Sequence, residues 1–67
     1  MESIKIDSTN IKIVYYDENK KEMFVFFHTG NLYKYFEIDR NIINKFKLEN
    51  NKPKYIKENL HRYTKIY

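Results

Sequence analysis

The most informative stretch of the chain is MFVFFHTGNLYKYF, residues 23–36. It contains two runs rich in aromatic and β-branched residues, Met23–Phe27 and Leu32–Phe36, which are typical of strands. Between them lies the only glycine of the chain, Gly30. Because glycine adopts positive φ angles without strain, His28-Thr29-Gly30 predicts a three-residue hairpin loop. The stretch therefore predicts two antiparallel strands joined by a tight turn.

The length of this loop determines which side chains share a face of the sheet. With three residues in the loop, one face carries Met23, Val25, Phe27, Tyr33 and Tyr35. The other face then carries Phe24, Phe26, Leu32, Lys34 and Phe36. A two-residue loop would instead place Phe24 and Phe26 with the tyrosines, because a slip of one residue inverts a strand. We favour the three-residue loop.

The flanking sequence adds a strand and two helices. IKIVYY, residues 11–16, reads as a strand, and the polar residues 17–22 follow it as a loop. The N-terminal residues 1–7 read as an extension in which Ile4-Lys5-Ile6 is a candidate short strand. Asp39 is placed to cap a helix that begins at Arg40. Pro53 suits the first position of a second helix.

Each helix carries an apolar stripe that indicates a core-facing side. In the first helix the stripe consists of Ile42, Ile43 and Phe46, and in the second of Ile56, Leu60 and Tyr63. The order strand-strand-strand-helix-helix predicts an α+β fold. We expect a three-stranded antiparallel meander followed by two short α-helices packed on one face, forming a single domain over residues 1–67.

Length and composition restrict the class of protein. A chain of 67 residues buries only about 60% of its unfolded surface, so its core must be compact. The absence of cysteine excludes disulfides and thiolate metal sites. No apolar run approaches the roughly 20 residues that span a bilayer, and Met1-Glu2-Ser3 begins no signal peptide. We therefore expect a cytoplasmic protein.

The charge is unevenly distributed. The chain carries +4 overall, with a net −2 over residues 1–39 and +6 over residues 40–67. A one-sided positive charge can steer a protein to a polyanion, but it can equally be a solvated face. Lys, Asn, Ile and Tyr supply 35 of the 67 residues, a bias that an AT-rich genome could produce unaided.

The order and spacing of several short motifs resemble the KTSC domain, a family named for its occurrence at the C-terminus of some lysyl-tRNA synthetases. The resemblance rests on Ser8-Thr9-Asn10-Ile11, Tyr16-Asp17, the strand Met23–Phe27, Gly30 and the central Tyr33-Lys34-Tyr35. It extends from Ser8 to Tyr63. Such domains also occur alone as short bacterial and phage proteins. The family has no established activity, and RNA binding has been suggested only from the synthetase fusion.

The chain departs from the family pattern around both helices. Ile38-Asp39 replaces a Val-Pro before the first helix, so a capping residue takes the place of a proline. Asn51-Lys52-Pro53 replaces a Ser-x-Gly before the second helix, which puts in doubt any backbone ligand contact of that loop. His61 occupies the position of a family arginine.

The sequence offers little for catalysis. The two histidines, His28 and His61, lie far apart and neither has a metal-ligand spacing. A single glycine cannot form a phosphate-binding loop, and no serine or threonine lies in a glycine-rich nucleophile turn. We expect a protein that is not an enzyme and that needs neither a metal nor a cofactor.

The aromatic and basic residues are the candidates for binding. Aromatic rings on a sheet can stack on bases while lysines and arginines neutralise phosphates. The candidate nucleic-acid-binding residues are Tyr33, Lys34, Tyr35, Lys54, Tyr55, Lys57, His61 and Arg62. For each there is a structural alternative, because Tyr33 and Tyr35 share a face with core residues, and Lys54, Lys57 and His61 can form a solvated helical stripe beside Tyr55.

Two short helices can cover only one face of the sheet. If they cover the Met23 face, then Phe24, Phe26 and Phe36 face water and indicate a partner surface. Our leading hypothesis is a non-catalytic module that binds RNA or single-stranded nucleic acid. The alternative is a protein-interaction module that uses the three phenylalanines, as a homodimer or as a small inhibitor of a host protein. A small anionic ligand such as a nucleotide is a third hypothesis.

Overall fold

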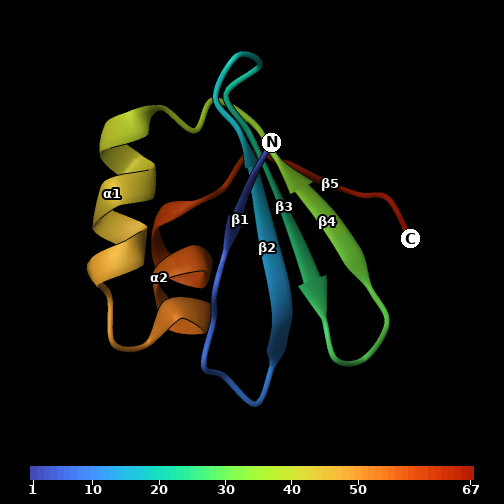
Figure 1. The fold of residues 1–67 in the computed structure, drawn as a ribbon. Coiled ribbons are helices and arrows are strands. Elements are labelled where there is room, and N and C mark those ends of the chain that lie inside the picture. Colours follow the sequence, from blue (N-terminus) through green and yellow to red (C-terminus); the bar gives the residue numbers. More distant parts are fainter.

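In the computed structural model, residues 1–67 form one antiparallel sheet and two helices (Figure 1). The strands are β1 (Glu2–Ile4), β2 (Ile11–Asp17), β3 (Glu22–Phe27), β4 (Leu32–Tyr35) and β5 (Tyr63–Lys65). The helices α1 (Arg40–Leu48) and α2 (Lys52–Asn59) lie between β4 and β5 in the sequence. In the sheet the strands follow the order β1-β2-β3-β4-β5.

The predicted α+β fold, with two helices and an antiparallel sheet, is confirmed, but the predicted number of three strands is wrong. The sheet has five strands because β1 and β5 add to its two edges. The N-terminal strand occupies Glu2–Ile4 and not Ile4–Ile6, since Ile4 pairs with Val14. The C-terminal strand β5 pairs with β4 and takes up backbone groups that a three-stranded sheet would leave open at that edge.

The predicted register of the central hairpin is confirmed. Val25 lies opposite Tyr33 and Met23 lies opposite Tyr35. The loop is closed by Phe27, whose N–H donates to the Asn31 carbonyl at 2.9 Å. Gly30 has a φ of 98°, a positive value that glycine adopts without steric strain. The three-residue loop therefore places Phe27 with the tyrosines.

A β-bulge at Lys12 changes the face of the sheet on which the Ile11 side chain lies. The register shifts between Ile11, which pairs with Phe27, and Ile13, which pairs with Phe26. Strict alternation would turn Ile11 to the face opposite Val14. The extra residue instead brings both side chains to the same face, where each is at most 1% exposed.

The first helix begins where the sequence predicts, and the second begins one residue earlier. Asp39 caps α1, its side chain accepting from the N–H of Ile42 at 2.9 Å. Asn51 caps α2, so that helix begins at Lys52 and Pro53 stands one position later than predicted. The assignment of Tyr63 to the stripe of the second helix is wrong. The helix ends at Asn59, Leu60 is already extended, and Tyr63 begins β5.

Both helices lie on the same side of the sheet (Figure 1). They enclose one core of twelve buried side chains: Ile4, Ile11, Val14, Tyr16, Met23, Val25, Tyr35, Ile38, Ile43, Phe46, Ile56 and Leu60. Neither helix has the length and apolar character that a bilayer span requires. The helices cover the face that carries Met23 and Val25, which settles a choice that the hairpin register leaves open.

The turn at Gly30 yields a prediction about stability. A Cβ at this position would meet no atom within 4 Å, so the cost of Gly30→Ala comes from the positive φ alone. We expect a loss of about 1–3 kcal/mol, measured by urea unfolding. The control is chemically synthesised protein with D-alanine at position 30, which favours positive φ and should be at least as stable as the parent. Equal destabilisation by both enantiomers would contradict this account.

Candidate functional site

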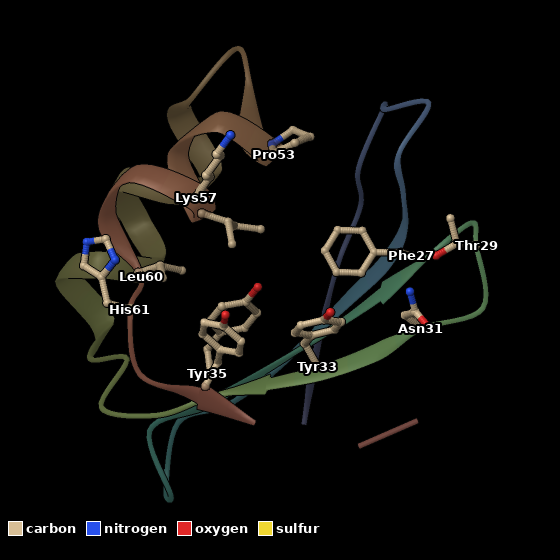
Figure 2. A pocket seen from close by; sticks show the side chains of 11 residues that line it. Phe27, Thr29, Asn31, Tyr33, Tyr35, Pro53, Lys57, Leu60 and His61 are labelled. Atoms are coloured by element: carbon tan, nitrogen blue, oxygen red, sulfur yellow. The ribbon is translucent and has the colours of Figure 1, made fainter. Parts of the chain in front are cut away.

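An open groove of about 450 Å³ lies between α2 and the β3–β4–β5 side of the sheet (Figure 2). The sheet supplies one wall and α2 with the residues that follow it supplies the other. Its eleven lining residues are Phe27, Thr29, Asn31, Tyr33, Tyr35, Pro53, Ile56, Lys57, Leu60, His61 and Tyr63. The groove exists because a helix of eight residues covers only part of the sheet face beneath it.

Four aromatic rings form a continuous cluster on the sheet wall. Tyr33 lies at its centre, with ring centroids 5.5 Å from Phe27, 6.4 Å from Tyr35 and 5.6 Å from Tyr63. Strand pairing explains the arrangement, because Tyr63 lies directly opposite Tyr35 on the neighbouring strand. Exposure increases from Tyr35, which is buried, through Tyr33, which is half-buried, to Tyr63, which is 54% exposed. Tyr33 and Tyr63 therefore present ring surface to a ligand, and Tyr35 forms the floor.

The hydroxyl of Tyr35 reaches the groove from a buried ring. Its oxygen makes no hydrogen bond within the chain. Every buried side-chain polar atom of the chain has a hydrogen-bond partner, so this oxygen is not buried and solvent reaches it. In Figure 2 the hydroxyls of Tyr33 and Tyr35 point from the sheet toward α2. Burial raises the pKa of Tyr35 to about 12, and the neighbouring Tyr33 and Tyr63 add to this shift. Tyr35 is therefore a neutral donor at ordinary pH.

The wall formed by α2 contributes positive charge and no negative charge. Lys57 is exposed, forms no ion pair and lines the α2 wall, and its side chain extends away from the tyrosine rings in Figure 2. His61 follows the end of the helix and is also exposed. None of the eleven lining residues is an Asp or a Glu. The groove thus combines aromatic rings with a cation that has no acidic partner.

The structure brings together four of the eight residues predicted to bind nucleic acid, Tyr33, Tyr35, Lys57 and His61. The predicted stripe of Lys54, Lys57 and His61 on one helix face is wrong, because α2 ends before His61. Lys54 lies with Tyr55 in a separate hollow that also contains Glu58.

Two other predicted cations lie outside the groove and are paired with carboxylates. Lys34 lies on the opposite face of the sheet, with its Nζ 3.8 Å from a carboxylate oxygen of Glu22. Arg62 pairs with Glu37 at 2.5 Å. Because these charges are already balanced, they offer less attraction to a phosphate than Lys57 does.

The face of the sheet opposite the helices holds Phe24, Phe26 and Phe36, as predicted, and no element covers it. The rings are half-buried, because lysine side chains lie over them. The Nζ of Lys34 is 5.8 Å from the Phe24 ring centroid and 5.4 Å from that of Phe36, and Lys12 lies over Phe26. The protein-interaction role of this face stays a prediction.

Sequence reasoning missed several residues of the groove. Tyr63 was assigned to the core stripe of the second helix, although it is one of the most exposed rings of the site. The sequence pattern places Thr29 and Asn31 in a turn and Phe27 on the face of Tyr33, but it identifies none of the three as a site residue. The hairpin register already placed Phe27 beside Tyr33, so this contact could have been predicted; the position of Tyr63 depends on β5.

The arrangement defines a small α+β domain with an aromatic groove between its sheet and its second helix. The KTSC domain family matches this chain over residues 7–63. The chain belongs to that family, which confirms the resemblance found in the sequence. No curated protein matches the chain.

The raised pKa of Tyr35 predicts how stability depends on pH. Folding favours the neutral phenol, so its contribution is fully present below the ordinary pKa of about 10 and is lost as pH rises toward about 12. We expect the free energy of unfolding, measured with urea between about pH 9 and 11, to fall less steeply with pH for Tyr35→Phe than for the parent protein. The two slopes should differ by up to about 1.4 kcal/mol per pH unit. Tyr15→Phe, on a more exposed tyrosine, is the control and should lose stability as the parent does. An unchanged pH dependence in Tyr35→Phe would refute the assignment.

Proposed function

We propose that the groove binds single-stranded nucleic acid, RNA above all, without catalysing a reaction. One observation carries this proposal: the half-buried ring of Tyr33, the exposed ring of Tyr63 and the unpaired Lys57 line one groove, and no acidic residue lines it. Membership of the KTSC family is compatible with the proposal but assigns no activity. The support for nucleic-acid binding therefore comes from the chemistry of the groove.

The two tyrosine rings are suited to stacking. Their planes are tilted by 40° and their centroids are 5.6 Å apart, so a base can lie against either ring or between the edge of one and the face of the other. Stacking on an aromatic side chain contributes about 1–3 kcal/mol per base and tolerates every base. Because the rings lie inside a groove, only an unpaired base can reach them. This favours single strands over duplexes.

Polar groups on both walls of the groove can fix the orientation of a nucleotide. The Tyr33 and Tyr35 hydroxyls, the Asn31 amide and the Thr29 hydroxyl supply donors and acceptors on the sheet side. Lys57 supplies a charge for a phosphate on the helix side. A volume of about 450 Å³ is within the range of sites that hold one small-molecule ligand. We infer that the groove takes about one nucleotide at a time.

The first test compares two tyrosines on opposite faces of the sheet. Tyr63→Val removes an exposed ring of the groove and keeps a β-branched residue in β5. Tyr15→Val makes the same change at a tyrosine that is 39% exposed on the face opposite the helices. Binding of fluorescein-labelled oligouridylate, measured by anisotropy, should weaken about 5- to 150-fold for Tyr63→Val and by little for Tyr15→Val. Equal losses, or no binding by the parent protein at about 50 mM salt, would exclude this function for the groove.

The second test uses salt. Each phosphate contact with a single strand contributes about −0.7 to the slope of log K against log[salt]. Because Lys34 and Arg62 are paired with carboxylates and Lys54 lies elsewhere, we expect contact with only about two phosphates and a slope near −1.4.

The variant for this test is Lys57→Gln, which should reduce the magnitude of the slope by about 0.7. Lys45→Gln is its matched control, since Lys45 is an exposed lysine of α1 that does not line the groove. A slope of Lys57→Gln equal to that of Lys45→Gln would show that the phosphates bind elsewhere. Competition by free mononucleotides as strong as by the oligonucleotide would favour the small-ligand hypothesis.

A further inference from the structure

We propose that β5 is a dimerisation edge, at which a second copy of this chain adds its own β5 in antiparallel orientation. The two five-stranded sheets would then join into one. This proposal rests on the backbone and side chains of residues 62–67 and does not require the groove to bind nucleic acid. The dimerisation test can therefore fail while the proposed function stands, and the nucleic-acid binding test can fail while the dimer stands.

The outer side of β5 has unpaired backbone groups. At the end of the chain, Tyr67 exchanges two hydrogen bonds with Leu32, its carbonyl accepting at 2.9 Å and its N–H donating at 3.1 Å. Over residues 62–66, alternate residues face β4: the carbonyl of Arg62 accepts from Phe36 at 2.9 Å, Thr64 lies opposite Lys34, and the N–H of Ile66 donates to Leu32 at 2.7 Å. In an antiparallel pair, the residues between these direct their N–H and C=O groups away from the partner strand. For β5 these are Tyr63 and Lys65. Such groups are a template for another strand.

The opposite edge of the sheet is protected and β5 is not. At β1, Glu2 accepts hydrogen bonds from Arg40 and Lys47 of α1, so charges and a helix lie beside that edge. Residues 63–67, by contrast, include three of the six large hydrophobic residues that are most exposed: Tyr63, Ile66 and Tyr67. An edge that is both unpaired and apolar is suited to pairing with another strand.

The β5 sequence is complementary to itself in one register. If the twofold axis passes beside Thr64, then Tyr63 of each copy lies opposite Lys65 of the other, and all four outward backbone groups of each strand find partners. Lys65 then lies beside an aromatic ring, a favourable cation–π pair. Arg62 lies opposite Ile66, so no two like charges oppose each other. This complementarity identifies a second copy as the occupant.

The dimer would change the composition of the groove. Tyr63 lines the groove, and Lys65 lies opposite Tyr33 on the same face of the sheet. Pairing about Thr64 brings Lys65 of the second copy next to Tyr63, so each groove gains a cation from its neighbour. The two grooves open on the same side of the joined sheet, because edge-to-edge pairing keeps the faces aligned. If the groove binds nucleic acid, one strand can then contact both copies.

Disulfide trapping tests the register directly, because the chain has no cysteine. Thr64 of each copy would form a non-hydrogen-bonded pair with Cα atoms about 4.5 Å apart, within the range of about 4.4–6.8 Å that a disulfide requires. Under mild oxidation, Thr64→Cys should give several-fold more covalent dimer than Ile66→Cys. In the same register the two Ile66 positions are displaced by four residues, about 13 Å, although Ile66 is itself 49% exposed.

Sedimentation of the unmodified protein supplies the second measurement. The average mass should rise with concentration, and Lys65→Pro should reduce that rise, because proline removes an outward N–H and leaves the bonds to β4 intact. Lys65→Thr keeps the N–H and should retain more association than Lys65→Pro. Circular dichroism confirms that each variant is folded. Equal trapping of Thr64→Cys and Ile66→Cys would overturn the proposal, and so would a parent protein that stays monomeric at every concentration.

Discussion

The packing of two short helices on one face of the sheet holds this domain together. Ile43 and Phe46 of α1 are fully buried, as are Val14, Met23 and Val25 of the sheet. With burial of such a side chain contributing about 1.5–3 kcal/mol, the twelve residues of a single cluster supply most of the stabilisation that a chain of this size can obtain. Every other feature depends on this one-sided contact, because it determines which part of the sheet the helices leave open.

The groove follows from that constraint. α1 and α2 together provide only four strongly buried side chains, including the capping Leu60. They therefore shield the centre of the sheet and leave its β4–β5 side partly open, where Tyr33 and Tyr63 lie. A core that is too small to cover its own sheet thus produces an aromatic surface beside a lysine.

Local sequence signals predicted the hairpin and both helices, but not the edges of the sheet or the bulge. Gly30 fixed the turn because it is the only glycine, and Asp39 marked the start of α1. Tyr63 was misassigned because its spacing from Ile56 also fits a helix, and an exposed strand of three residues carries no alternating apolar pattern. That Lys57 lines the same groove as the tyrosines depends on how α2 packs, which no local pattern encodes.

The order of pairing has a consequence for synthesis of the protein. Strands β1 to β4 pair with neighbours that are adjacent in the sequence, whereas β5 pairs with β4 across the two helices, Lys65 lying opposite Tyr33. On the ribosome, the edge of β4 must therefore stay unpaired until residues 63–65 leave the exit tunnel. The connection between β4 and β5 is also the longest in the sheet, so closing it costs more chain entropy than closing any of the hairpins.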